Sequence, residues 1–129
     1  MISFIWNGIN VPRETLLTHT AWYCLSMGKD NIYKVSSEGE IQIFLSEYQD
    51  WVFEEDRLKA SFKLGDFETA IAVINKVAEV AKQMDHHPRI VNTYTQLEFS
   101  LCTHSAGDKV TSYDFALAKE ISAIIASYK

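Results

Sequence analysis

Residues 58–64 alternate apolar and polar side chains, beginning with Leu58 and ending with Leu64. Successive side chains of a β-strand point to opposite faces of a sheet, so this alternation predicts a half-buried strand. Residues 51–55 are predicted as the strand that precedes it. Glu55-Asp56 lies between the two segments and is the expected hairpin turn.

A second pair of strands is predicted further along the chain, a short one at 89–94 and a longer one at 95–103. Alternate positions of the longer strand are apolar. We expect these positions to face the core and the polar positions to face the other side of the sheet. The apolar set is Leu97, Phe99 and Leu101, and the polar set is Gln96, Glu98, Ser100, Cys102 and His104.

Apolar residues recur with a helical period over residues 67–81, which predicts an amphipathic helix with one buried face. Asp66 precedes this segment and can cap its first turn. The helix is expected to end near Asp85, because Pro88 disfavours helical geometry at the residue before it. The apolar stripe consists of Phe67, Ala70, Ile71, Ile74, Val77, Ala78 and Ala81.

Two further helices are predicted from capping boxes, in which a Ser or Thr cap is followed three residues later by an acidic residue. Ser37 and Glu40 have this spacing before the first helix, and Thr111 and Asp114 have it before the last. The buried faces are expected to hold Ile41, Phe44, Leu45 and Tyr48 in the first helix, and Phe115, Ala118, Ile121 and Ile125 in the last.

The predicted order is therefore α-β-β-α-β-β-α. Hairpin strands with helices packed on one face form an α+β fold, here with an antiparallel four-stranded sheet. A chain of 129 residues is expected to hold one such domain, over residues 36–129. Residues 1–35 show no clear period and are interpreted as an N-terminal extension of unknown role. They form either an arm that packs on the domain or on a neighbouring subunit, or upstream sequence added by a wrong start site, since Met27 lies close to the expected beginning.

Charge and composition exclude several classes of partner. The net charge is −5 and the basic residues are scattered, which argues against a nucleic-acid surface. No apolar run approaches the roughly 18 residues of a membrane span, and the N-terminus lacks the basic start of a signal peptide. Cys24 and Cys102 are far apart, which favours two free thiols in a reducing compartment. We expect a cytoplasmic protein without a nucleic-acid or membrane partner.

Three of the four histidines fall in one stretch of the chain. His86 and His87 precede Pro88 at the end of the long helix, and Thr103-His104 closes the strand 95–103. Histidine exchanges protons near neutral pH more readily than other side chains, so the cluster suggests acid/base chemistry on a small molecule. Two alternatives remain open: the histidines cap a helix and lie on the surface without a function, or they bind a metal.

The spacing of this stretch resembles the signature of the pterin-4a-carbinolamine dehydratases, in which His-His-Pro is followed by an aromatic residue, a histidine and an aspartate. Flanking residues agree as well, and the resemblance covers roughly residues 36–128. The whole pattern is specific, whereas His-His-Pro alone is weak. The matching residues are His86, His87, Pro88, Tyr94, His104 and Asp114.

The resemblance implies the same order of helices and strands, usually in a homodimer or homotetramer, and a hydro-lyase activity. The substrate would be 4a-hydroxytetrahydrobiopterin, the pterin-4a-carbinolamine, which loses water across C4a and N5 to give the quinonoid dihydropterin. No metal or other cofactor is implied. The reaction would serve tetrahydrobiopterin recycling, with an aromatic amino acid hydroxylase as an implied partner.

We expect His86 and His104 to be the proton-transfer pair, because one group must protonate the departing hydroxyl and another must take the N5 proton. His87 would bind the pterin or share in acid catalysis. Asp114 could orient His104 as a supporting carboxylate, or act mainly in its capping box. Pro88 and Thr103 are expected to support the site.

Tyr94 has two interpretations, stacking on the pterin or burial in the core, as is common for an aromatic residue in a strand. Three features depart from the family pattern. Lys82 stands where an acidic residue is frequent, Ile90 stands where Trp is frequent, and the loop at 105–110 is one residue longer than the commonest form.

A non-catalytic function is the alternative to the enzyme. Members of the family also act as dimerisation cofactors of a homeodomain transcription factor, and relatives act in assembly. The long apolar helix could then pair with a partner helix or with its own copy. All three histidines are present, which favours the enzyme.

Overall fold

The computed structural model describes residues 3–6, 9–12 and 34–129. The chain divides into two compact units, Met1–Ile32 and Tyr33–Lys129. The second unit carries all the residues predicted for the site, so the fold is described mainly for that unit.

The first unit contains a two-stranded hairpin, in which β1 (Ser3–Trp6) and β2 (Ile9–Pro12) pair antiparallel. The order of apolar and polar residues in 1–35 does not predict this hairpin. The signal was available, because Asn-Gly, here Asn7-Gly8, is typical of a tight turn between two strands. His19 and Cys24 lie outside the described residues.

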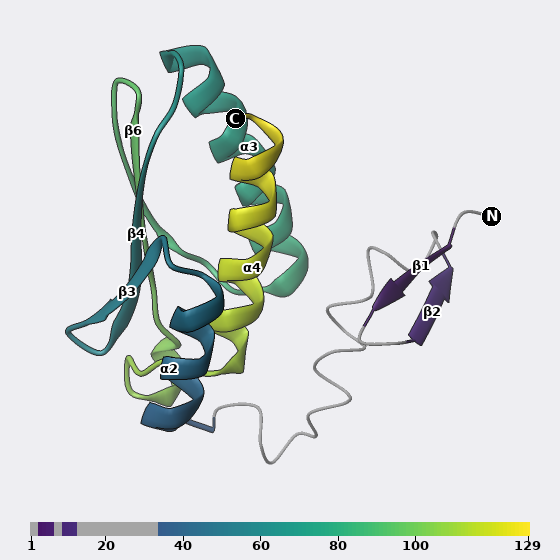
Figure 1. The fold of residues 1–129 in the computed structure, drawn as a ribbon, viewed down its shortest axis with the longest axis vertical. Helices are drawn as coiled ribbons and strands as arrows, with labels where there is room; N and C mark the ends of the chain where they lie inside the picture. The colour runs from purple at the N-terminus through teal and green to yellow at the C-terminus, as the bar shows by residue number, and fades with distance from the viewer. Residues whose placement is uncertain (1–2, 7–8, 13–33) are drawn as a thin grey trace. The chain divides into compact units, whose positions relative to one another are not determined.

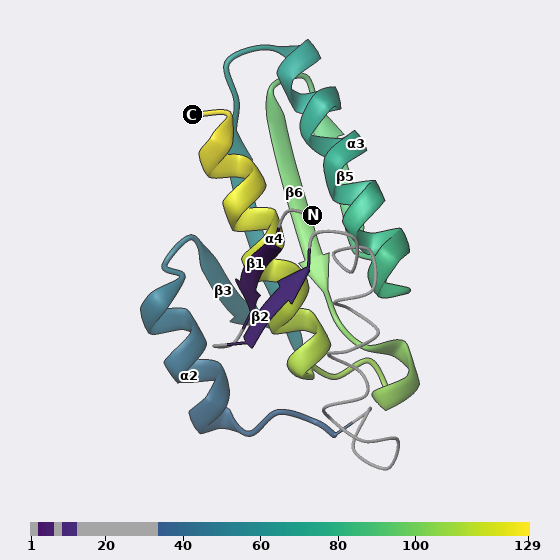
Figure 2. The ribbon, with the colours of Figure 1, turned by 90° about the vertical axis from the view of Figure 1, so that its right-hand side faces the viewer.

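The second unit has the predicted α+β fold, which the structure confirms. Its four strands pair antiparallel in the order β3-β4-β6-β5, and the three helices lie on one side of this sheet (Figures 1 and 2). The strands are β3 (Trp51–Glu54), β4 (Arg57–Lys63), β5 (Arg89–Thr93) and β6 (Gln96–Leu101), and the helices are α2 (Glu38–Glu47), α3 (Phe67–Met84) and α4 (Ser112–Ser127).

The turn between β3 and β4 is the predicted one. Glu55 and Asp56 both adopt left-handed backbone conformations, with φ of 53° and 59°. Two consecutive left-handed residues form the tight turn whose twist matches that of the flanking strands. The hairpin register then pairs Trp51 with Ala60.

The core lies between the sheet and the helices and follows the predicted alternation. Leu97, Phe99 and Leu101 on β6 are fully buried, as is Leu58 on β4. The helix α4 crosses this layer and contributes Ile121, which is also fully buried. The polar residues that alternate with these on β6 point to the opposite face of the sheet. No helix of this unit covers that face (Figure 1).

The helix ends confirm the capping predictions. Ser37 and Thr111 each accept a backbone hydrogen bond in a complete capping box, the first with Glu40 and the second with Asp114. Asp66 caps α3 through a bond from the Thr69 backbone N–H. In the described part of the chain, no helix combines the length and the apolar character needed to cross a membrane.

Candidate active site

The end of α3 positions the first histidine. The helix stops at Met84, and Asp85 takes a left-handed conformation with φ 48°. The His86 backbone N–H then reaches back to the Ala81 carbonyl at 3.0 Å, which closes the helix end. This sharp stop is what Pro88, two residues later, predicts from the sequence.

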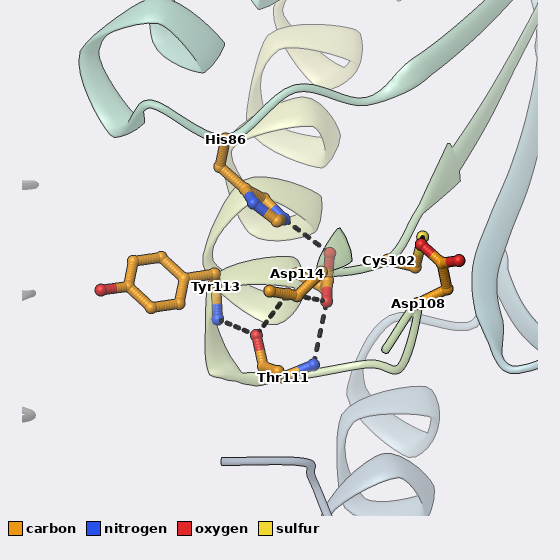
Figure 3. Close-up of polar contacts among 7 residues, drawn as sticks. His86, Cys102, Asp108, Thr111, Tyr113 and Asp114 are labelled. Carbon is orange, nitrogen blue, oxygen red and sulfur yellow. Dashed lines mark hydrogen bonds and ion pairs between the residues drawn. The ribbon is translucent and has the colours of Figure 1, made fainter. Parts of the chain in front are cut away.

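The imidazole of His86 forms a short contact with a buried carboxylate. Its Nε2 lies 2.6 Å from Oδ1 of Asp114, in the first turn of α4 (Figure 3). The side chain of His86 is 11% exposed and that of Asp114 is 0% exposed. The two residues come from the end of one helix and the start of another, which pack against each other.

Asp114 is held by three hydrogen bonds in all. Its Oδ2 accepts from the Thr103 hydroxyl and from the Thr111 backbone N–H, both at 2.9 Å. The Thr103 hydroxyl uses its hydrogen in the bond to Asp114, so its oxygen can only accept a second bond. The Thr111 hydroxyl therefore donates to Thr103 Oγ1 at 2.6 Å. The Thr111 oxygen in turn accepts from the Tyr113 backbone N–H at 3.3 Å (Figure 3). The arrangement satisfies each of these buried groups.

The direction of these bonds fixes the tautomer of His86. An ionised carboxylate can only accept, so His86 carries a hydrogen on Nε2. In the neutral ring Nδ1 is then the nitrogen with a free lone pair, able to take a proton. The Tyr113 ring lies 5.9 Å from the His86 ring, centroid to centroid, and borders the same site.

The partner of Asp114 differs from the prediction. Asp114 was expected to orient His104, and it bonds to His86 instead. The reason lies in strand geometry. β6 ends at Leu101 rather than at the predicted residue 103. Beyond it the Thr103 side chain turns to the buried carboxylate, and His104 begins a short 3-10 helix. The capping role of Asp114 is confirmed by its complete capping box.

His104 has a carboxylate partner of its own. It begins the short 3-10 helix η3 (His104–Ala106), and its side chain is 95% exposed. Its Nδ1 lies 2.8 Å from Oδ1 of Asp108 in the loop that follows. The hydrogen bond from His104 is the main cause that lowers the pKa of Asp108 below its ordinary value. Asp108 was not among the predicted site residues.

The other predicted residues lie at different depths. His87 is exposed and Pro88 is half-buried, at the start of the connection to β5. Tyr94 lies in the β5–β6 turn and is 71% exposed, so the prediction that it belongs to the core is wrong. Six residue steps along β5 separate it from Pro88, about 20 Å at 3.4 Å per residue. Within one chain it therefore does not join the histidines.

The residues that depart from the family pattern do not touch the His86 network. Lys82 is exposed in the last turn of α3. Ile90 pairs with Phe99 in the sheet register and is half-buried. The loop at 105–110 matters for the site, because it carries Asp108.

Cys102 approaches the same loop from the end of β6. Its thiol lies 3.9 Å from Asp108 Oδ1, and burial is the main cause that raises its pKa. The thiol form therefore predominates at neutral pH, and it can donate a weak hydrogen bond to the carboxylate. Cys102 forms no disulfide with the other described residues.

A separate hollow of about 410 Å³ lies on the face of the sheet that carries no helices. Its lining includes Lys59, Arg89 and Glu98, and none of the predicted site residues. Across the described ranges, no group of three or more His, Cys, Asp or Glu side chains is arranged to hold a metal ion.

Comparison with known proteins agrees with this geometry. The family model described as "Pterin 4 alpha carbinolamine dehydratase" matches residues 34–124. A "putative pterin-4-alpha-carbinolamine dehydratase" of Sulfolobus acidocaldarius is 39% identical over 87 residues, 67% of this chain and 94% of that protein. A protein of the same name from Nostoc sp. is 40% identical over 88 residues, 68% of this chain and 94% of its own.

A solved structure is similar over the same region. It is the crystal structure of a transcriptional coactivator/pterin dehydratase from Brucella melitensis, with 31% sequence identity and a TM-score of 0.67. The match covers 70% of this chain and 98% of that one. With the matched region, the fold and the histidine pattern in agreement, the chain belongs to the pterin-4a-carbinolamine dehydratase family.

Proposed function

We propose that this chain catalyses the dehydration of 4a-hydroxytetrahydrobiopterin to the quinonoid dihydropterin, with His86, His87 and His104 as its acid/base groups. One observation carries the proposal. The buried Asp114 carboxylate binds His86 and, through the Thr103 hydroxyl, the strand end whose next residue is His104. The Asp114 carboxylate thus bonds directly to His86 and to Thr103, the residue before His104.

The reaction requires two proton transfers and no change of oxidation state. The C4a–O bond breaks as the hydroxyl receives a proton and leaves as water, and the N5–H proton is removed as the C4a–N5 double bond forms. An imidazolium can supply the first proton and a neutral imidazole can take the second. The two rings are restored when they exchange protons with solvent.

The support around His86 suits it to proton transfer. Asp114 keeps a hydrogen on Nε2, so Nδ1 is the nitrogen that exchanges a proton with the substrate. A hydrogen-bonded carboxylate also stabilises the positive charge that the ring gains when it accepts a proton. Thr103 and Thr111 fix the carboxylate, which limits the freedom of the His86 ring.

His104 and His87 complete the proposed set. His104 is exposed and held by Asp108, and it would exchange the second proton. His87 is exposed next to His86 and would bind the pterin or share in acid catalysis. Pro88 limits the backbone at His87 and so supports its placement. The pterin ring would lie across the exposed edges of these rings.

The proposal also covers the cofactor, the compartment and the partner of the reaction. The reaction uses no cofactor, and it would take place in the cytoplasm as part of tetrahydrobiopterin recycling, next to an aromatic amino acid hydroxylase.

Stopped-flow absorbance can test the activity directly. The purified chain should remove 4a-hydroxytetrahydropterin faster than buffer, and His104→Ala should lose roughly 100-fold of that rate. His19→Ala is the control, because His19 lies outside the residues that match the family. A folded wild-type chain that gives no acceleration over buffer would refute the catalytic proposal.

A second function is favoured by the surface of α3. Phe67 is 47% exposed and Ile71 is 36% exposed, whereas the buried residues of the same helix are Ala70, Val73, Val77, Ala81 and Met84. The relative from Brucella melitensis is described as a transcriptional coactivator as well as a pterin dehydratase. We propose that the exposed side chains of Phe67 and Ile71 pair with a second copy of α3 in a homodimer or homotetramer, or with a helix of a partner protein in a dimerisation or assembly role.

Analytical ultracentrifugation separates these possibilities. Ile71→Glu should lower the sedimenting mass if copies pair through α3, because a charge would be buried in the interface. Lys76→Glu, an exposed position on the same helix, is the matched control. A monomeric wild-type chain would exclude self-association and leave only a partner protein to bind Phe67 and Ile71.

A further inference from the structure

The loop after His104 is closed by its own backbone. The Thr103 N–H donates to the Lys109 carbonyl at 2.8 Å, and the Asp108 N–H donates back to the Thr103 carbonyl at 3.1 Å. The Gly107 N–H bonds to the His104 carbonyl at 3.0 Å. Asp108 therefore sits at a fixed point of a small ring, directly across from His104.

The backbone at this point selects the residue type. Gly107 and Asp108 are both left-handed, with φ of 76° and 60°. Glycine adopts this region freely, and Asp and Asn are the residues with side chains that tolerate it best. The loop thus provides a position that accepts a carboxylate without strain, four residues after a histidine.

The carboxylate contacts a defined atom of the imidazole. Asp108 Oδ1 lies 2.8 Å from His104 Nδ1 and 3.9 Å from the Cys102 thiol. The positive charge of Arg57 on β4 also acts on Asp108 and on Cys102. Asp108 is ionised at neutral pH and can only accept, so the ring hydrogen of His104 belongs on Nδ1.

We infer that Asp108 is a positioning residue for the dehydration: it holds His104 in the tautomer with hydrogen on Nδ1, so that Nε2 is the nitrogen that exchanges a proton with the pterin. This inference rests on the proposed function for its catalytic part. It also distinguishes the two rings, because His86 carries its hydrogen on Nε2 and presents Nδ1. The two histidines would act through opposite ring nitrogens.

Two substitutions separate charge from hydrogen bonding at this position. Asp108→Asn removes the charge and keeps an amide oxygen that can accept from Nδ1, and it suits the left-handed backbone. Asp108→Gly also suits the backbone and removes the acceptor altogether. Asp56→Asn is the matched control: Asp56 is an aspartate with φ 59°, half-exposed and bonded to Lys109 at 2.6 Å.

The closing experiment has two readouts. Long-range proton–nitrogen NMR of the imidazoles, with His104 identified by its loss in His104→Gln, reports the tautomer without any substrate. Stopped-flow dehydration from about pH 5.5 to 9 reports kcat and KM across the range in which histidine titrates. We expect hydrogen on Nδ1 in the wild type and in Asp56→Asn, and a mixture of tautomers in Asp108→Gly.

In the rate measurement, Asp108→Gly should lower kcat by about tenfold with little change in KM, and Asp108→Asn by less. An unchanged tautomer in Asp108→Gly would overturn the inference. So would a changed tautomer with an unchanged kcat and pH profile. If the wild type itself gives no acceleration, the proposed function fails, and the NMR result still decides whether Asp108 orients His104.

Discussion

This domain contains two histidine–aspartate pairs, His86–Asp114 and His104–Asp108, that are built in opposite ways. His86 and Asp114 meet across two helices at 2.6 Å, with side chains 11% and 0% exposed. His104 and Asp108 meet within one loop at 2.8 Å, with side chains 95% and 52% exposed. The first pair depends on the packing of the domain, and the second depends on local backbone geometry.

The two aspartates are held in place by different parts of the structure. Asp114 is fixed by a backbone N–H, a hydroxyl and an imidazole from three segments of the chain. Asp108 is fixed mainly by the closed loop around it, and water competes for its hydrogen bond. The buried pair should therefore matter for folding and catalysis together, and the exposed pair for catalysis alone.

The largest expected effect comes from applying one substitution to both pairs. Asp114→Asn should lower the free energy of unfolding by about 3 kcal/mol, because it removes a buried charge that three donors surround. Asp108→Asn should change the free energy of unfolding only slightly, because its pair with His104 is open to solvent. Urea unfolding at neutral pH measures both, and equal losses in the two variants would abolish the distinction.

A smaller effect is expected one bond further from His86. Thr103→Val keeps the shape of the side chain and removes the hydroxyl that donates to Asp114 and accepts from Thr111. We expect a loss of about 1 to 2 kcal/mol in the free energy of unfolding, since a buried donor and acceptor lose their partners. Thr103→Ser is the control and should retain most of the stability in the same urea titration.

The smallest effect concerns acid. The pKa of Asp108 is lowered in the folded chain by the bond from His104, so its contribution to stability is present above its unfolded pKa and is lost as pH falls through the folded value. Asp108→Asn should therefore be slightly less stable than the wild type at pH 7, and its stability should decline slightly less below about pH 4.

Unfolding at a series of pH values checks this expectation. Asp66→Asn is a useful comparison, because the pKa of Asp66 is lowered by the Thr69 backbone N–H rather than by a histidine, and Asn is an equally good cap. An acid decline in Asp108→Asn identical to that of the wild type would show that the exposed pair has no energetic coupling to folding.

Features encoded locally were predicted well from the sequence. Capping boxes at Ser37 and Thr111, the turn at Glu55-Asp56 and the alternation along β6 each depend on neighbours within a few residues. Local rules of this kind need no knowledge of tertiary packing. They were sufficient for the order of helices and strands. They were wrong for part of the buried face of α3, because Phe67, Ile71 and Ala78 of the predicted stripe are exposed.

Features that depend on packing were predicted less well. Asp114 has two predicted roles, capping its helix and orienting His104. The capping is confirmed, whereas the packing of α3 against α4 makes His86 its histidine partner. Tyr94 fell in the expected strand region but lies in a turn with φ 54°. Asp108 could have been found from its spacing of four residues to His104 within a loop already noted as long.

The double use of Asp114 has a consequence for how sequences of this kind are interpreted. Because the same carboxylate completes the first turn of α4, selection for a stable fold would preserve it even in a relative that had lost all catalysis. Its presence is then weak evidence of activity. A histidine at position 104 with a carboxylate in the following loop contributes nothing to the core, so its retention would be the more informative sign of a working enzyme.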